Sequence, residues 1–371
     1  MCAFRDWRLL GWLAACFAGM AVLAAEVFPV REAVAGVAIA QHNAGTAEPR
    51  TELATRHSGF TVNGKITFLY GVSYYAALGA SEETIRRDLE IAQREGFNWI
   101  RVWATWAAFT NDVSAVDGEG WAREPFLTKL KTLVAECDRR GLIVDVTFSR
   151  GTGANGTARL HTQAAHRRAV ETVVNALRPW RNWYLDLSNE RNVQDQRFTS
   201  FEDLKELRRL VRQWDATRLV TASHGGDIGR DDLRRYLMDV EVDFISPHRL
   251  RGAGSAAQTK ARTEEYLATM KEIGRVVPVH YQEPFRRGYG KWEPKAKDFA
   301  SDLRGAMAGG AAGWCFHNGS ARDAAQGRPR RSFDLRAQGL FEQLDAEGRA
   351  ALNLLRSIKK ARFPLTTPFL H

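Results

Sequence analysis

The stretch VSYYAALGASEE, residues 72–83, joins the first apolar strand of the chain to its first amphipathic helix. In an open dinucleotide-binding sheet, this turn carries the pattern GxGxxG, whose glycines let the backbone approach a pyrophosphate. The turn here lacks that pattern, and no GxxxxGK[ST] phosphate loop occurs in the 371 residues. A parallel barrel is therefore favoured, and a doubly wound open sheet remains the alternative.

Outward from this turn, short apolar strands alternate with amphipathic helices to the end of the chain. We expect eight strands, centred near Phe68, Ile100, Val144, Leu185, Val220, Phe244, Val279 and Cys315. Helices are expected over 82–95, 126–140, 201–214, 263–273 and 297–308, with a last one near Leu354. This alternation predicts the α/β class and a (β/α)8 TIM barrel. Alternating apolar residues around Asn63-Gly64 predict a hairpin before the first barrel strand.

The N-terminus has the order of a secretory signal. Arg5 and Arg8 precede LLGWLAACFAGMAVLAA, 17 apolar residues that end in small side chains. We assign 1–25 as a signal peptide, 26–58 as a linker and 59–371 as the (β/α)8 domain, and we expect a secreted or periplasmic protein. A retained membrane anchor and a lipoprotein cleavage box at Leu13–Cys16 are the alternatives.

Composition narrows the choice of partners. The chain carries 53 Lys and Arg against 43 Asp and Glu, a net charge of +10, yet it lacks any recognisable nucleic-acid-binding motif. Outside the expected signal, the cysteines are Cys137 and Cys315; they are expected to be buried thiols, because neither lies in a CxxC or beside a His pair. We therefore expect a monomer with no cofactor, no metal and no nucleic-acid partner.

Polar and aromatic residues collect where the strands end. In a parallel barrel the active site is built at the carboxyl ends of the strands. Those ends carry Tyr74, Tyr75, Arg101, Trp103, Trp106, Arg150, Asn189, Glu190, His224, His248, Glu283, Trp314 and His317. Two carboxylates, on the fourth and seventh strands, are thus expected to face one cavity together with an arginine and a histidine.

The chain resembles glycoside hydrolase family 5 in three motifs, GFNWIRVW, LDLSNE and VPVHYQE. It also resembles that family in the order of its strand-end residues, which is RVW on strand two, NE on strand four, H on strand six, E on strand seven and W on strand eight. The likeness covers residues 59–318. It implies Glu190 as the acid/base and Glu283 as the nucleophile of a retaining β-glycosidase. It also implies Arg101 as a supporting cation, His248 as a supporting histidine and Trp314 as a sugar platform.

Two positions depart from that family. A His usually follows strand three, where this chain has FSRGTG, and a Tyr usually stands two residues after the strand-six His, where Leu250 lies in PHRLRG. Tyr281 is the candidate for part of that Tyr's role. The departures bear on the subfamily and on the substrate, which is a carbohydrate.

Glycosidic cleavage passes through an oxocarbenium-like state, so one carboxyl must protonate the leaving oxygen while another attacks the anomeric carbon. We expect the repulsion between the two charges to raise the pKa of the acid, and Arg101 to keep the nucleophile ionised. Asn189 is expected to donate to the sugar 2-hydroxyl. The structural alternatives are a salt bridge for Arg101, a turn residue for Asn189, a satisfied strand end for His248 and core packing for Trp314.

Rival functions remain open at this stage. One is a catalytically inactive barrel that binds carbohydrate or scaffolds a partner, and another is a metal-dependent hydrolase built from scattered His residues. Four loop arginines, Arg249, Arg251, Arg286 and Arg287, follow the sixth and seventh strands. They indicate either an anionic glycan substrate or solvated surface charges.

Overall fold

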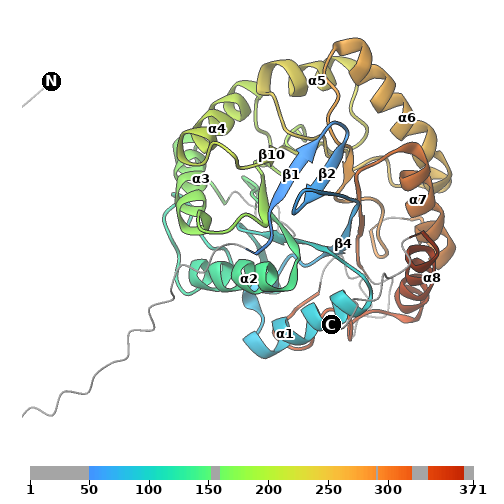
Figure 1. Ribbon diagram of the computed structural model, residues 1–371. Helices are drawn as coiled ribbons and strands as arrows, with labels where there is room; N and C mark the ends of the chain where they lie inside the picture. Colours follow the sequence, from blue (N-terminus) through green and yellow to red (C-terminus); the bar gives the residue numbers. More distant parts are fainter. Residues whose placement is uncertain (1–49, 152–158, 290, 320–332, 363–371) are drawn as a thin grey trace, which may run out of the picture. The chain divides into compact units, whose positions relative to one another are not determined.

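A parallel sheet of seven strands forms the centre of the computed structural model (Figure 1), in the spatial order β10-β9-β8-β5-β4-β12-β11. The structure describes residues 50–151, 159–289, 291–319 and 333–362. The strands are β4 (Leu69–Ser73), β5 (Trp99–Trp103), β8 (Ile143–Thr147), β9 (Trp183–Asp186), β10 (Val220–Thr221), β11 (His280–Tyr281) and β12 (Gly313–Phe316). All of these residues are buried, which explains their near-continuous apolar sequences.

Residues 243–247 close this sheet into a barrel between β10 and β11. Parallel bridges join His224 to Pro247 on one side and Ile245 to Val279 on the other. The ladder is short here because Pro247 and Pro278 have no N–H to donate. The segment is the sixth of eight strand positions, so the predicted (β/α)8 barrel is confirmed and the open sheet is excluded.

Helices surround the sheet (Figure 1). They are α1 (Glu82–Arg94), α2 (Phe126–Arg140), α3 (Gln163–Leu177), α4 (Phe201–Trp214), α5 (Arg230–Arg235), α6 (Ser255–Ile273), α7 (Ala296–Gly309) and α8 (Ala346–Arg362). A short π-helical segment, Tyr236–Val240, follows α5, and the small strands β6 (Ala107–Ala108) and β7 (Asn111–Asp112) pair in the loop after β5. Within the described ranges, every helix is too short or too polar to cross a bilayer.

Helix α6 begins earlier than the sequence predicts, at Ser255 instead of residue 263. Its first turns carry small and polar side chains, so they lack the apolar periodicity that marks a helix. The reason is close packing on α7: a Cβ added at Gly309 would stand 2.7 Å from both the Lys260 carbonyl oxygen and the Thr263 Cβ. Small residues in the first turns of α6 allow this close contact, but they leave that part of the helix without an amphipathic sequence pattern.

A three-stranded antiparallel sheet covers the amino-terminal end of the barrel. It consists of β1 (Leu53–Arg56), β2 (Gly59–Val62) and β3 (Lys65–Thr67), and the predicted hairpin turns at Asn63 and Gly64, both with positive φ. Phe60 is fully buried against Phe244, with ring centroids 5.0 Å apart.

The folded unit therefore starts before the predicted domain boundary at residue 59. Leu53 is buried in the same cluster as Phe60, and the Thr51 backbone donates to Asp138 on α2 at 2.9 Å. Residues 50–58, assigned to the linker from sequence, thus belong to the barrel unit. The predicted signal at 1–25 and the linker up to residue 49 lie outside the described residues.

Strand alternation sorts the buried side chains into an interior and an outer layer. The barrel interior has an apolar layer and a polar layer. Trp99, Ile143 and Cys315 belong to the apolar layer, and the fully buried polar side chains of Arg101 and Asp145 lie next to it, towards the carboxyl ends of the strands. Both cysteines of the described chain are free and buried, as predicted. The polar layer is the floor on which the functional site stands.

Candidate active site

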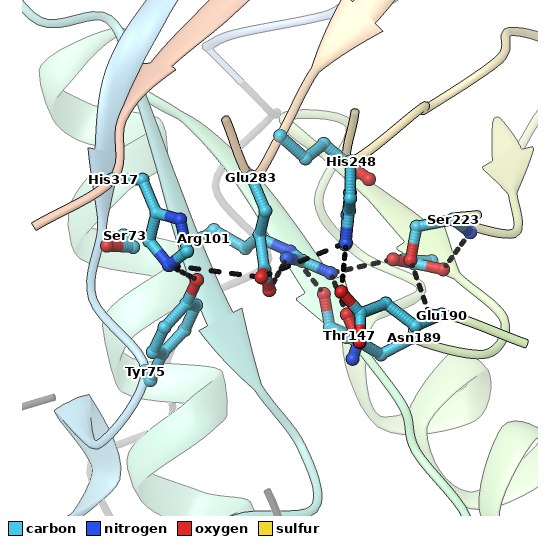
Figure 2. A network of polar contacts seen from close by, with 12 residues as sticks. Ser73, Tyr75, Arg101, Thr147, Asn189, Glu190, Ser223, His248, Glu283 and His317 are labelled. Atoms are coloured by element: carbon cyan, nitrogen blue, oxygen red, sulfur yellow. Dashed lines mark hydrogen bonds and ion pairs between the residues drawn. The ribbon is translucent and has the colours of Figure 1, made fainter. Parts of the chain in front are cut away.

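The two predicted catalytic glutamates meet at the carboxyl end of the barrel (Figure 2). Glu190 follows β9, and Glu283 follows β11. One carboxylate oxygen of each glutamate and one ring nitrogen of His248 all lie within 4.8 Å of one another. Barrel closure thus brings together residues that are 93 positions apart.

Arg101, the predicted supporting cation, lies fully buried beneath this pair. Its guanidinium pairs with Glu283 and with Asp186, the latter at 2.8 Å. Its Nε lies 3.1 Å from an Asp145 carboxylate oxygen, and the side chain also donates to Thr147. A buried cation is tolerated because these carboxylates compensate its charge. The structural salt bridge and the support of Glu283 are therefore both features of this residue.

The backbone around Glu190 is held in an uncommon conformation. Glu190 has φ of 46°, in the left-handed region that non-glycine residues seldom occupy. Its N–H donates to Ser223 Oγ at 3.0 Å, and the next N–H, of Arg191, donates to the Ser223 carbonyl at 3.1 Å. Asn189 is positioned by Arg101, whose Nη2 donates to Asn189 Oδ1 at 3.0 Å. The polar segment that follows β9, residues 188–192, is thus a constrained strand terminus.

Three cationic or donor groups surround the Glu190 carboxylate. Arg197 donates at 2.5 Å, His248 Nδ1 lies at 3.2 Å and Arg251 Nη2 at 3.3 Å. Burial raises the pKa of Glu190, as does the charge of Glu283, but His248 and Arg251 outweigh both and bring the pKa to about 2. The expectation that the pKa of the acid would be raised is therefore wrong for the protein without substrate.

Glu283 is held as an anion. Its Oε1 accepts from Arg101, its Oε2 accepts from Arg251 at 3.1 Å, and His248 Nδ1 lies 3.8 Å from Oε2. Burial raises the pKa of Glu283, but the electrostatic interactions with His248 and Arg101 outweigh it and lower the pKa well below its usual range. An ionised carboxylate at this position can act as a nucleophile.

Two predicted substrate contacts do not reach the site. Trp314 is fully buried and donates from its indole nitrogen to Asp302 on α7 at 2.6 Å, so it faces the helices and offers no sugar platform. The Tyr281 hydroxyl lies 2.7 Å from Thr263 on α6, also outside the barrel. Tyr281 and Trp314 are register partners on β11 and β12, so both side chains point to the same outer face.

Arg251, and not the candidate Tyr281, is the residue after the strand-six His that contacts Glu283. It lies three residues after His248, while Leu250 between them is 68% exposed. His317, after β12, also faces the site: its Nε2 lies 2.8 Å from the Tyr75 hydroxyl and 3.8 Å from Glu283 Oε2. The strand-end pattern located Tyr75 and His317, but it gave no sign that Arg251 and Arg197 contact the glutamates.

The four loop arginines divide into two pairs. Arg249 lies against Thr259 and 3.5 Å from Asp227, and Arg287 pairs with Asp345 at 2.9 Å, so both stabilise the fold. Arg251 contacts both glutamates, and Arg286 Nη1 lies 3.0 Å from His317 Nε2. Only the second pair borders the candidate site.

Glu190, His248 and Glu283 have a spacing that a metal ion could use. The guanidinium groups of Arg101, Arg197 and Arg251 already bind these carboxylates. A divalent cation would have to displace them and stand among positive charges. The residues present therefore do not fit a resident metal.

Comparison with known proteins gives a fold and no sequence family. No family model matches the chain, and no curated protein matches its sequence. A candidate glycoside hydrolase from Bacteroides vulgatus matches at a TM-score of 0.62 and 15% identity, over 85% of this chain and 62% of that one. This chain therefore spans less than two thirds of that structure.

Two other solved structures match over comparable shares of both chains. A glycoside hydrolase family 5 mannosidase from Rhizomucor miehei has a TM-score of 0.57 and 12% identity, over 85% of this chain and 99% of that one. An endo-β-1,4-mannanase from Thermotoga petrophila has a TM-score of 0.56 and 16% identity, over 80% and 77%. The barrel described here is thus the fold of the family 5 glycoside hydrolases.

Proposed function

We propose that the protein is a retaining β-glycosidase that cleaves a β-linked oligo- or polysaccharide with two glutamates. The observation that carries the proposal is the meeting of Glu190 and Glu283, with carboxylate oxygens within 4.8 Å, at the carboxyl end of the barrel. Retaining glycosidases hold their carboxyl groups about 5–5.5 Å apart, whereas inverting ones leave about 6.5–9.5 Å for a water molecule. The short separation supports double displacement.

In the first step, a Glu283 oxygen bonds to the anomeric carbon as the glycosidic C–O bond breaks, and Glu190 gives its proton to the leaving oxygen. In the second step, Glu190 takes a proton from water, whose oxygen replaces Glu283 on the same carbon. Glu283 suits the first role because Arg101 binds it from below and keeps it ionised. Glu190 is the more exposed carboxylate and suits proton exchange.

Supporting groups have defined places around this chemistry. Asn189 Oδ1 accepts from Arg101, so its amide nitrogen is the atom left to donate to a sugar hydroxyl. A hydrogen bond to the 2-hydroxyl strengthens as the transition state forms. His248 Nδ1 lies between the two glutamates, at 3.2 Å from Glu190 and 3.8 Å from Glu283, and orients both.

The test is reducing-sugar release from a panel of β-glucans, β-mannans and uronic-acid polymers. Wild-type protein should cleave one class, and Glu283→Gln and Glu190→Gln should each lower turnover by orders of magnitude while the thermal transition stays close to that of wild type. Near-normal turnover in either variant would contradict the assignment. The release pattern separates internal from terminal cleavage.

A second candidate function is carbohydrate binding without turnover. It is favoured by the arginines that hold Glu190 as an anion, because a general acid must carry a proton. Binding of one glycan class without release of reducing sugar under any condition would support this function.

We also propose export, on the signal-like residues 1–25. Mass spectrometry of the mature N-terminus tests it. Cleavage after Ala24 or Ala25 would support secretion, a lipidated Cys16 would support a lipoprotein, and an intact Met1 in a membrane fraction would support an anchor.

A further inference from the structure

Arg251 occupies the place where a substrate must react. A single guanidinium nitrogen, Nη2, lies 3.3 Å from Glu190 Oε1 and 3.1 Å from Glu283 Oε2. Glu283 Oε1 is held by Arg101, so Oε2 is the oxygen that remains for attack. The leaving oxygen must reach Glu190 while the anomeric carbon reaches Glu283. Arg251 in its present position and a scissile bond therefore compete for the same contacts.

Arg251 and Arg286 lie around the same aromatic ring, so an anion bound by Arg286 could also bind Arg251. The Arg251 guanidinium carbon lies 4.8 Å from the Tyr289 ring centroid, and that of Arg286 lies 5.6 Å from the same centroid. Tyr289 is 42% exposed, so this pair of cations reaches the rim of the site. Two guanidinium groups around one ring make a compact positive surface, which an anion would bridge.

Arg286 lacks the counter-charge that the structural arginines have. In the described part of the chain, no carboxylate lies within 4.0 Å of it, whereas Arg249 and Arg287 each have two. Its Nε is buried without a hydrogen-bond partner in that same part of the chain. Its neighbour His317 can accept a hydrogen bond from Arg286 but brings no negative charge, because burial holds the pKa of that imidazole well below its usual range and keeps it neutral. Glu283 and Glu190 act on Arg286 only from beyond ion-pair distance. A partly buried cation without a direct ion pair is costly and points to a missing anion.

Building on the proposed glycosidase function, we propose that the substrate is an anionic glycan whose acidic group binds Arg286 and Arg251, and that this binding draws Arg251 away from the two glutamates. A carboxylate or a sulfate would accept hydrogen bonds from the planar guanidinium groups of both side chains. A neutral sugar offers no group that would hold Arg251 elsewhere. The arginine thus links recognition of the acid to exposure of the reacting oxygens.

The experiment compares binding of a uronic-acid polysaccharide with binding of the same polysaccharide after carboxyl reduction. Calorimetry on Glu283→Gln protein, which stops turnover, is run at about 20 mM and about 200 mM salt. The acidic polymer should bind at least about tenfold more tightly at low salt, and the difference should shrink at high salt. A sulfated neutral polysaccharide forms a separate arm that distinguishes sulfate from carboxylate.

Variants assign the effect to the site. Arg286→Ala should reduce binding of the acidic polymer to that of the reduced polymer, and Arg286→Lys, which keeps the charge but loses the fork, should fall between. The matched control is Arg262→Ala on α6, an arginine whose side chain is 42% exposed and paired with Glu265, which changes net charge equally and should keep the preference. Thermal unfolding shows that each variant is folded.

Equal binding of acidic and reduced polymers, no binding of any acidic polymer, or a preference that survives Arg286→Ala would overturn the proposal. Failure of the glycosidase function looks different. Selective, Arg286-dependent binding without cleavage by the wild-type protein would leave the anion site intact and refute turnover alone.

Discussion

Replacing Arg251 by Met tests how the proton state of Glu190 is set. Methionine keeps much of the length and apolar stem of arginine, but it removes the nitrogen that lies 3.3 Å from Glu190 and 3.1 Å from Glu283. The groups that still face the Glu190 carboxylate are Arg197, His248 and Glu283. The change is therefore the loss of one positive charge from an otherwise intact cluster.

The size of the effect follows from the contact. An opposite charge at this range lowers a carboxyl pKa by about 1–3 units, and each unit corresponds to about 1.36 kcal/mol. The pKa of Glu190 is about 2 with Arg251 in place. Because Arg197 and His248 remain, we expect a rise toward the lower end of that range, about 1–2 units. Glu283 keeps Arg101 and stays ionised.

The assay is the pH dependence of kcat/KM, which reports the pKa values of the protein without substrate, on whichever glycan the panel identifies. Glu190 must be protonated to act as acid, so a higher pKa moves the alkaline limb of kcat/KM to higher pH by about 1–2 units. The pH dependence of kcat reports the complex, so a shift in kcat on a neutral substrate that is absent on its acidic counterpart would show that the acidic group has already withdrawn Arg251. An alkaline limb of kcat/KM that stays in place on both substrates refutes this reasoning.

Three further changes follow from the contacts described. Arg101→Met leaves Asp145 and Asp186 buried without their cation, so we expect the unfolding free energy to fall by about 3–5 kcal/mol and activity to be lost. Denaturant titration and turnover measure the two effects, and stability equal to wild type would contradict the buried pairing. Trp314→Phe removes the donor to Asp302, so stability should fall by about 1–3 kcal/mol while KM on the true substrate stays unchanged; a raised KM with wild-type stability would restore the sugar-platform role. Glu190 has a depressed pKa, so its contribution to stability is present above its usual pKa of 4.5 and is lost as the pH falls toward 2. Across that interval, wild type should lose on the order of 3 kcal/mol more unfolding free energy than Glu190→Gln. Parallel acid unfolding curves of the two proteins would count against the depressed pKa.

Sequence patterns predicted the fold well where periodicity and turn chemistry are strong. Helix α2 spans the predicted residues 126–140, because buried Leu130, Leu133 and Cys137 recur on one face and Gly141 ends the helix in the left-handed conformation. The Asn63-Gly64 turn was predicted for the same kind of reason. Strand ends also predicted the meeting of Arg101, Glu190, His248 and Glu283, since barrel closure leaves them no other place.

The errors have physical causes that a single sequence does not reveal. Tyr281 and Trp314 were wrongly assigned to the barrel interior. Strand β11 has two residues, too few for alternation to show which face Tyr281 lies on, and Trp314 is paired with Tyr281 and therefore lies on the same face. Arg197 and Arg251 come from loops, whose paths have no periodicity to follow. The pKa of Glu190 was misjudged because the repulsion from Glu283 was foreseen, but the hydrogen bond from His248 and the charge of Arg251, which together outweigh it, were not.

The most direct test of the account is azide rescue of the two glycine variants, with the stereochemistry of the product determined by NMR. On an aryl β-glycoside of the sugar that the panel identifies, azide should restore turnover of Glu283→Gly and give the α-glycosyl azide, because azide occupies the vacated nucleophile position and inverts the anomeric carbon once. It should restore Glu190→Gly through the covalent intermediate and give the β-glycosyl azide. The same anomer from both variants, or the two anomers exchanged, would contradict the assignment of Glu283 as nucleophile and Glu190 as acid/base.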